Sequence, residues 1–290
     1  MTAPADGPHR PQATTPHHLT LTDTQFQTLG EAVRRSPSIG NTQPWRLRRL
    51  PDGLTILEDT ARDLPGTDPA GRERTISCGT AILNARIAMC GLSLRPRVEL
   101  CPEPHNKRVL ASVRATETSP PAREDLELLR MIPRRHTHHR VYRSHAIAEE
   151  DLFALRESVT AEGARLTVAD SPARRHLAEL LPPTRPCEST GNRTRKELAR
   201  STILIISTAG DTRHDWIVAG LALERLLLTA GLKGLVAAFG EQHLQDNTMR
   251  PRVAEALQIW GIPQALLRIG RALVDPPKTP RRPLSELLEP

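Results

Sequence analysis

Two long helical patterns, at 69–94 and 215–233, constrain the fold of this chain more than any other feature. They match in register, with Gly79 and Ala81 of the first pattern opposite Gly220 and Ala222 of the second. A true match predicts two related α+β halves whose long helices pack against each other, a covalent form of a symmetric dimer. Helices rich in alanine and leucine also match by chance, so the alignment alone leaves both explanations open.

The elements around these helices follow one order in both parts of the chain. In the first part we expect a helix at 22–35, strands at 46–50 and 54–58, the long helix, strands near 98–100 and 109–115, and a short helix at 125–131. In the second part we expect a helix at 149–160, a strand at 164–169, a helix at 172–181, a strand at 202–207, the long helix, and a strand at 265–270. The expected domains are a disordered tail at 1–19, a first half at 20–133 and a second half at 134–290.

Hydropathy and cysteine usage indicate the compartment. The 290 residues contain no apolar run of 18, and the first residues lack the apolar stretch of a signal peptide. We therefore expect a cytoplasmic protein with no membrane contact. Four cysteines without a Cys-x-x-Cys pair predict free thiols in that compartment.

The net charge of +7 comes from arginine, because only four of the 40 basic residues are lysine. The planar guanidinium of arginine suits bidentate binding of phosphate, so an anionic ligand is favoured. Nucleic acid is not the expected partner, because aromatic residues are sparse and no helix-turn-helix or zinc-finger spacing occurs.

A polar loop at 36–45 follows the first helical pattern. Its side chains with hydrogen-bonding groups are Ser36, Ser38, Asn41 and Gln43. Two prolines fix φ and one glycine permits a positive φ, which suits a loop that holds a flat polar ligand. Turn and capping contacts within the loop are the alternative use of these side chains. Trp45 starts a strand, so we expect it to anchor the loop in the core rather than to stack on a ligand.

Two arginine clusters lie further along the chain. The first contains Arg134, Arg135 and Arg140 with the Thr137 hydroxyl between them, and the second is the pair Arg281 and Arg282. Both can supply charge-assisted hydrogen bonds to a phosphate, although a run of charge is more commonly a solvated surface. No metal site is expected at the neighbouring histidines, because the arginines oppose a divalent cation and the motif has no carboxylate.

The segment SPSIGNTQPW at 36–45 resembles the polar loop of the nitroreductase superfamily of FMN proteins. Further segments, in the same order, resemble the Acg-like branch of that superfamily. They are DPAGRE at 68–73, ISCG at 76–79, IPRRHT at 132–137, ALER at 222–225, GIPQ at 261–264 and PRRP at 280–283. The similarity covers 21–290.

This resemblance implies an α+β, nitroreductase-like fold in which one chain forms an intramolecular pseudo-dimer, as a monomer or a weak homodimer. It implies one FMN per chain, because the loop occurs only in the first half and the basic motifs only in the second. Ser36, Ser38, Asn41 and Gln43 are expected to face the ribityl chain and the isoalloxazine. The phosphate is expected to bind Arg134, Arg135, Thr137, Arg140, Arg281 and Arg282. Gly240 and Glu241 are expected beside flavin N5, unless that segment is only a helix-terminating turn.

The resemblance further implies an oxidoreductase that passes hydride from NAD(P)H through FMN to a small organic acceptor. The flavin carries the chemistry, so no catalytic protein residue is expected. The alternative is a non-catalytic, flavin-sequestering protein of the Acg type, and a third class is a cofactor-free basic interaction module. Histidines at 138 and 139 depart from the family pattern, and the segment near 182–201 is shorter than in relatives, which would expose the flavin if the missing part is a lid.

Overall fold

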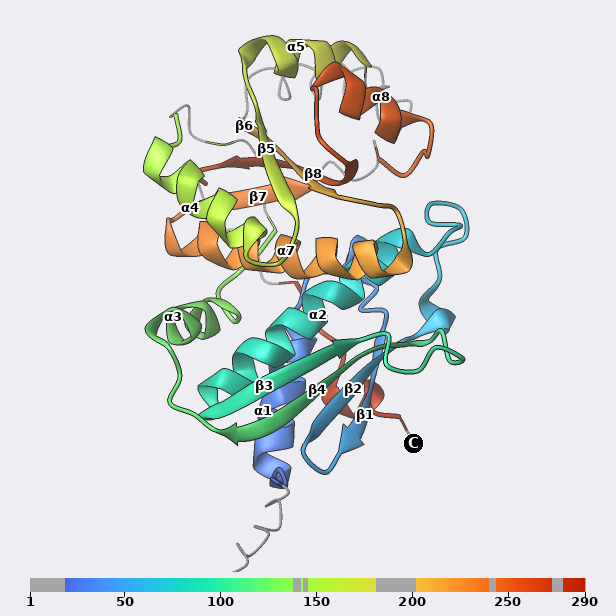
Figure 1. Cartoon of the computed structure of the whole chain (residues 1–290), viewed down its shortest axis with the longest axis vertical. Helices are drawn as coiled ribbons and strands as arrows, with labels where there is room; N and C mark the ends of the chain where they lie inside the picture. The colour runs from blue at the N-terminus through green and yellow to red at the C-terminus, as the bar shows by residue number, and fades with distance from the viewer. Residues whose placement is uncertain are drawn as a thin grey trace, which may run out of the picture.

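The computed structural model describes residues 19–137, 142, 146–180, 202–239, 244–272 and 279–289. It contains two antiparallel sheets of four strands, with two long helices between them (Figure 1). The expected tail at 1–19 lies almost entirely outside the described residues. In the described part of the chain, no helix is long and apolar enough to cross a membrane.

The first sheet has the strand order β1-β2-β4-β3 and the second has the order β5-β6-β8-β7. The first set of elements is α1 (Asp23–Arg34), η1 (Ile39–Asn41), β1 (Trp45–Leu50), β2 (Gly53–Glu58), η2 (Thr60–Arg62), α2 (Arg72–Gly91), β3 (Leu94–Leu100), β4 (Val109–Thr118) and α3 (Arg123–Met131). The second set is α4 (Glu149–Thr160), β5 (Arg165–Ala169), α5 (Ser171–Leu180), β6 (Thr202–Thr208), α7 (Arg213–Leu232), β7 (Val236–Phe239), α8 (Met249–Ala256), β8 (Ile262–Gly270) and η4 (Leu284–Glu286).

The two sheets have the same topology. In each sheet a long helix, α2 or α7, connects the second strand to the third, and the fourth strand returns between them. Both second strands also carry a register shift toward their ends, at Ile56/Leu57 in β2 and at Ile206/Ser207 in β6. The expectation of an α+β fold built from two related halves is therefore confirmed.

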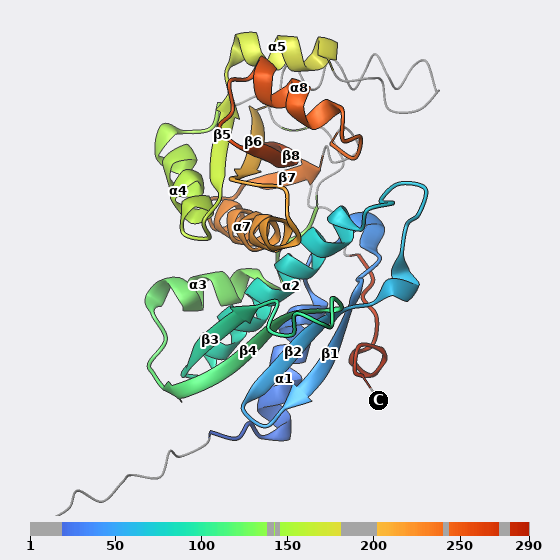
Figure 2. The same cartoon turned by 45° about the vertical axis from the view of Figure 1, so that its right-hand side comes forward.

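The long helices α2 and α7 cross between the sheets (Figures 1 and 2). Their backbones meet at Gly79 and Gly220, the two residues that the alignment paired. A Cβ atom at Gly79 would lie 2.5 Å from the carbonyl oxygen of Ile217 and 2.8 Å from Cα of Gly220. A Cβ atom at Gly220 would lie 2.1 Å from the carbonyl oxygen of Ile76. Glycine is required at both positions because side chains would separate the helices.

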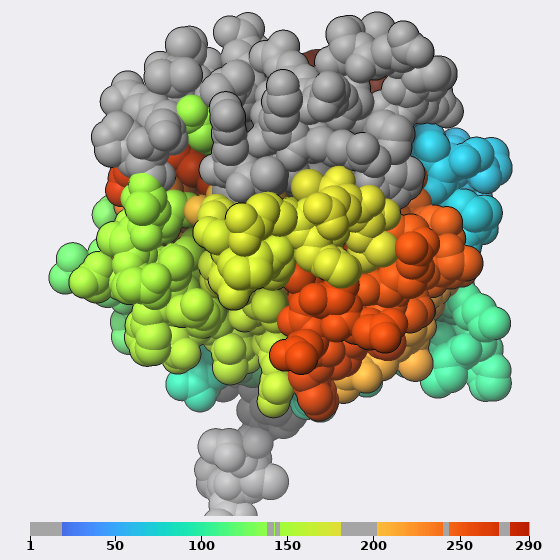
Figure 3. All heavy atoms as spheres, turned by 90° about the horizontal axis from the view of Figure 1, so that it is seen from above, coloured from blue at the N-terminus to red at the C-terminus, as the bar shows by residue number. Residues whose placement is uncertain are grey.

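The second sheet is covered on both faces. Successive side chains of a strand point to opposite faces, so the apolar run of β6 serves two clusters. Leu204 and Ile206 pack with α7, whereas Ile203 and Ile205 pack with α5 and α8. Figure 3, from above, shows α5 and α8 side by side on this outer face. β6 is therefore a central strand with no solvent-facing side.

The C-terminal segment returns from the second half to the first sheet. The Leu47 amide donates to the Leu287 carbonyl at 2.7 Å, and the Glu289 amide donates to the Leu47 carbonyl at 2.8 Å. The Leu287 side chain is fully buried in the first core. This return places Arg281 and Arg282 beside the first half, although they follow the last strand of the second.

The structure differs from the expected elements at several places. The sequence analysis missed β7 and α8, because β7 has four residues and α8 contains a proline at 251. That proline lies in the first turn, where a helix needs no backbone donor. The bounds 69–94 of the first long helix were wrong. The helix runs from Arg72 to Gly91, because Gly71 (φ 69°) and Ser93 (φ 58°) adopt left-handed backbone conformations at its ends.

We predict that Gly220→Ala lowers the free energy of unfolding by about 1–3 kcal/mol, because the new Cβ meets helix backbone that cannot rotate away. The matched control is Gly231→Ala on the same helix, where the new Cβ meets only the flexible end of Met131. The control should be neutral or stabilising, since alanine favours helix. Chemical denaturation of both variants checks this, and equal stabilities would contradict a tight crossing at Gly220.

Candidate functional site

The polar loop after α1 lies along one face of α2. The Ser77 hydroxyl accepts from the Ile39 amide at 3.1 Å, and the Thr80 hydroxyl donates to the Pro37 carbonyl at 2.9 Å. One turn further along, the Asn84 amide donates to the Ser36 hydroxyl at 2.8 Å. Residues spaced by three and four share a helix face, so α2 fixes the loop from a rigid element.

The loop backbone is unusual over a short stretch. Gly40, Asn41 and Gln43 have φ values of 53°, 56° and 50°. A left-handed conformation is costly for residues with a side chain and concentrates at functional sites. Inside the loop, the Ser38 hydroxyl accepts from the Gln43 amide at 2.9 Å. The alternative expected for these side chains, turn chemistry within the loop, therefore accounts for Ser38.

The C-terminal arginines bind this loop. The Arg281 guanidinium donates to Asn41 Oδ1 at 2.9 Å, and the Asn41 amide donates to the Pro280 carbonyl at 3.1 Å. The Arg282 backbone amide donates to Gln43 Oε1 at 2.9 Å. Both amide side chains that the sequence singled out thus contact the C-terminal pair, which no local pattern links to them.

The two predicted arginine clusters meet at the end of α1. The Arg35 carbonyl accepts from Arg135 Nη2 at 3.3 Å and from Arg281 Nη2 at 3.4 Å. Arg282 differs from Arg281, because its guanidinium is bound by Asp59 at 3.4 Å and by Glu286 at 3.3 Å. Arg135 and Arg281 are therefore the members that converge with little neutralisation.

This convergence leaves cationic groups without acceptors. Within the described part of the chain, Arg135 Nε and Nη1 and Arg281 Nε are buried and have no hydrogen-bond partner. The pKa of Arg281 is lowered to about 10 by burial first, and also by the charges of Arg135, Arg35 and Arg34, against the opposing effect of Glu224. Buried donors of like charge fit an anion that presents several acceptor oxygens.

A buried glutamate on α7 lies beneath the arginines. Glu224 is fully buried, and its Oε2 lies 3.7 Å from Arg135 Nε. Burial raises its pKa to about 7, although Arg135, Asn84 and Arg281 act in the opposite direction. Neither oxygen accepts a hydrogen bond within the described residues. The Glu224 carboxyl thus lies next to the Arg135 guanidinium but forms no close hydrogen bond with it.

Sequence reasoning assigned no role to Glu224 or Arg35. The signal for Glu224 was an acidic residue inside an otherwise apolar stretch of the long helix. The signal for Arg35 was its place directly before the polar loop.

The remaining predicted site residues are placed as follows. Arg134 is exposed, one residue from the buried Arg135. Thr137 forms an isolated bridge with Ala237 of β7, so the segment after α3 runs beside the second sheet. Arg140, Gly240 and Glu241 lie outside the described residues. Trp45 is fully buried, as expected for an anchor of the loop. No group of three or more potential metal ligands gathers among the described residues.

In the second half, the connection that corresponds in order to the polar loop is short. The connection between α1 and β1 covers 35–44, whereas that between α4 and β5 covers only 161–164. Glu162 in this short connection accepts from Arg86 of α2 and from Arg225 of α7, the latter at 2.5 Å. An ion-pair cluster therefore occupies this side of the helix pair.

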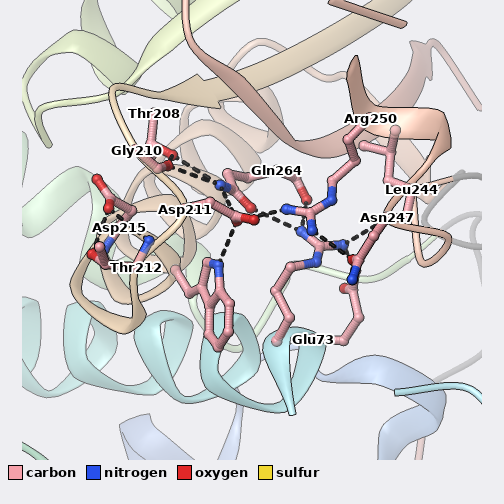
Figure 4. A network of polar contacts seen from close by, with 12 residues as sticks. Glu73, Thr208, Gly210, Asp211, Thr212, Asp215, Leu244, Asn247, Arg250 and Gln264 are labelled. Carbon is pink, nitrogen blue, oxygen red and sulfur yellow. Dashed lines mark hydrogen bonds and ion pairs between the residues drawn. The ribbon is translucent and has the colours of Figure 1, made fainter. Parts of the chain in front are cut away.

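A second polar network ties α2 to the second half (Figure 4). Arg72 donates to the Gln264 carbonyl at 2.7 Å and pairs with Glu73, whose pKa burial raises against the effect of Arg72. The two amide groups after Arg72 donate to Asp68, which caps the helix. These contacts give the charged side chains at 72 and 73 a structural role.

The far end of this network centres on Asp211. It accepts from Arg250 at 2.6 Å, from Trp216 Nε1 at 2.7 Å and from Gln264 at 3.1 Å (Figure 4). Burial acts to raise the pKa of Asp211, but these hydrogen bonds outweigh burial and lower it. Most polar groups here are satisfied, so the network reads as a joint between the halves rather than a ligand site.

No family model matches the chain. A Mycobacterium tuberculosis protein named "Putative NAD(P)H nitroreductase" is 31% identical over 343 aligned positions, which cover 100% of this chain and 97% of the relative. The chain belongs to the nitroreductase family. A second nitroreductase from that organism, named "Putative NAD(P)H nitroreductase acg", is 27% identical and covers 87% of this chain and 92% of the relative. The resemblance to the Acg-like branch is confirmed.

Solved structures of nitroreductase-like proteins align with about half of this chain. A nitroreductase-like protein from Bacillus cereus is 18% identical with a TM-score of 0.46, and covers 56% of this chain and 94% of its own. A structure described as a putative nitroreductase in complex with FMN, from Desulfovibrio desulfuricans, is 23% identical with a TM-score of 0.43 and covers 56% and 96%.

We predict that the cofactor-free protein loses stability as the pH rises from about 5 to about 8. Folding raises the pKa of Glu224 from 4.5 to about 7, so the folded state binds the extra proton in this interval and deprotonation favours unfolding. The loss attributable to this residue is at most about 3 kcal/mol. Urea unfolding of the wild type and Glu224→Gln across this range measures it. Parallel pH profiles for the two proteins would contradict the assignment.

Proposed function

We propose that this chain is an FMN-dependent oxidoreductase that passes hydride from NAD(P)H to a small organic acceptor, with one FMN per chain. The observation that carries this proposal is the set of buried guanidinium donors of Arg135 and Arg281 that lack acceptors beside the polar loop. A phosphate dianion presents three acceptor oxygens and two negative charges, which matches these donors.

The buried arginines fit the phosphate end of FMN, and the ring end is proposed from the loop. Arg135 and Arg281 would bind the phosphate, and Arg35, which precedes the loop, adds positive charge there. Thr137 follows Arg135 by two residues, and Arg140 completes the motif outside the described residues. Ser36, Ser38, Asn41 and Gln43 form or brace the loop wall that would face the ribityl chain and the ring. Gly240 and Glu241 remain proposed neighbours of flavin N5.

The chain's own residues would act by binding and orientation. When bound, FMN supplies the hydride acceptor and donor atom, N5, so no protein nucleophile is needed. The arginines hold the phosphate by charge, while α2 fixes the loop through Ser77, Thr80 and Asn84. The relatives named NAD(P)H nitroreductases support a nicotinamide nucleotide as the reductant. The short connection at 161–164 supports a single site, because it leaves no room between α4 and β5 for a loop like that at 36–45.

We predict that Arg135→Ala and Arg281→Ala each weaken FMN binding by about 10- to 100-fold, the range expected for losing hydrogen bonds to a charged group. Arg282→Ala should have a smaller effect, because Asp59 and Glu286 already neutralise that side chain. Fluorescence titration with FMN measures the three affinities. The control is Arg130→Ala, an exposed arginine on α3. Unchanged affinity for both Arg135→Ala and Arg281→Ala would contradict the phosphate site.

We predict that purified protein loaded with FMN loses its oxidised flavin absorbance when NADH or NADPH is added without oxygen. A following addition of a nitroaromatic or quinone acceptor should restore that absorbance, and the bound flavin should amount to one per chain. Flavin that binds but stays oxidised with both nucleotides would contradict turnover and support the flavin-sequestering alternative. Protein that takes up no FMN would contradict both functions and support a basic interaction module.

A further inference from the structure

Glu224 places a carboxyl beside the proposed phosphate site, where a negative charge would repel the ligand. Its carboxyl is fully buried on α7, and its Oε2 lies 3.7 Å from Nε of Arg135. A second nitrogen of that guanidinium, Nη2, donates to the Arg35 carbonyl, to which Arg281 also donates. A ligand anion bound to Arg135 and Arg281 would therefore share its counter-charges with a buried carboxylate.

The groups that face the Glu224 carboxyl come from three segments. They are Arg135 from the segment after α3, Arg281 from the C-terminal segment, and Asn84 from α2. Arg34 and Arg35 at the end of α1 act on Arg281 in turn. Arg225, the next residue on α7, pairs with Glu162 and Glu124 instead. Glu224 is thus the carboxylate whose negative charge interacts with the positive charges of Arg135 and Arg281.

A dianionic phosphate changes this balance. Its negative charge neutralises Arg135 and Arg281. It also repels the Glu224 carboxylate, and this repulsion is strong because water screens buried charges only weakly. Neutralising the Glu224 carboxylate removes its repulsion with the bound phosphate. A carboxyl gains neutrality by taking up one proton from solvent, which forms an O–H bond on one of its oxygens.

We propose that Glu224 takes up a proton when the FMN phosphate binds, so that cofactor binding and protonation of this carboxyl are coupled. This inference rests on the proposed FMN function. Burial already raises the pKa of Glu224 to about 7, and a nearby buried dianion raises it further, so that the carboxyl is neutral in the FMN-bound protein at pH 8. In the free protein, the Asn84 side chain and the charges of Arg135 and Arg281 favour the charged carboxylate, so the effect of the phosphate has to outweigh theirs.

This coupling predicts the direction in which pH changes the affinity for FMN. Above about pH 7 the free protein carries a charged Glu224 and must acquire a proton to bind FMN, so affinity falls as pH rises. For one coupled proton, Kd rises by up to about tenfold per pH unit. The phosphate stays dianionic in this range, because its second pKa is about 6. FMN titrations between pH 7 and pH 9 therefore isolate the protein group.

The decisive comparison is wild type against Glu224→Gln, which keeps the shape of the side chain and cannot ionise. We expect the FMN dissociation constant of the wild type to rise with pH, and that of Glu224→Gln to stay level and to be lower than the wild-type value at pH 9. A merely structural role for the carboxylate predicts weaker binding by the variant at every pH. A level profile for the wild type, or the same slope in both proteins, would overturn the proposal.

Two controls separate the phosphate effect from general effects of pH. Riboflavin lacks the phosphate, so its binding to the wild type should not show the slope. Glu73→Gln removes another buried carboxyl whose pKa burial raises, but that carboxyl pairs with Arg72 in a different network, so this variant should keep the slope. A slope with riboflavin, or its loss in Glu73→Gln, would count against Glu224 as the coupled group.

A measurement on the unmodified chain keeps the proposal testable if Glu224→Gln fails to fold. Calorimetry of FMN binding at pH 8, in buffers of different ionisation enthalpy, gives the number of protons taken up. We expect close to one proton per FMN, and an uptake of zero would overturn the proposal. Absence of FMN binding at every pH is a different outcome, because it contradicts the proposed function itself.

Discussion

The contact between the backbones of α2 and α7 at Gly79 and Gly220 is the constraint on which the rest of the structure depends. It sets the separation of the two halves at the distance of touching helix backbones. With that distance fixed, Asn84 of α2 and Glu224 of α7 face each other beside the crossing. The polar loop rests on α2, and the arginines gather over this meeting point. Any change that separates the helices would therefore disturb the fold and the candidate site together.

The arginine site illustrates how a chain can keep like charges together without a ligand. Some guanidinium groups are neutralised at close range, as Arg282 is by Asp59 and Glu286. Arg135 and Arg281 instead share the Arg35 carbonyl and lie beside the Glu224 carboxyl, which leaves donors unsatisfied. Unsatisfied buried donors cost stability, and sites for charged ligands commonly carry such a cost. The unsatisfied donors of Arg135 and Arg281 are thus the observation on which the proposed phosphate site rests.

The sequence predicted what local patterns determine. Helix α4 and both strands of the first hairpin follow from periodicity and turn residues, and the crossing of the long helices agrees with the first of the two explanations that their alignment left open. The sequence could not show that Arg281 would reach Asn41, because this contact depends on the return of the C-terminal segment to β1. It also gave no reason to separate the buried Arg135 from the exposed Arg134. Burial and long-range contacts decide those points, and neither has a local signature.

The joining of both halves in one chain has a consequence for how the molecule can vary. In a dimer of identical subunits, a substitution on one helix appears on its symmetry mate as well. Here, four residues beyond each crossing glycine, α2 carries Leu83 and α7 carries Glu224, and the next positions are Asn84 and Arg225. On one side of the helix pair, Glu224 lies beside arginines that keep unsatisfied donors, while on the other side Glu162 pairs directly with Arg86 and Arg225. Covalent linkage thus lets one face of the helix pair stay open to a ligand while the equivalent face is closed by ion pairs.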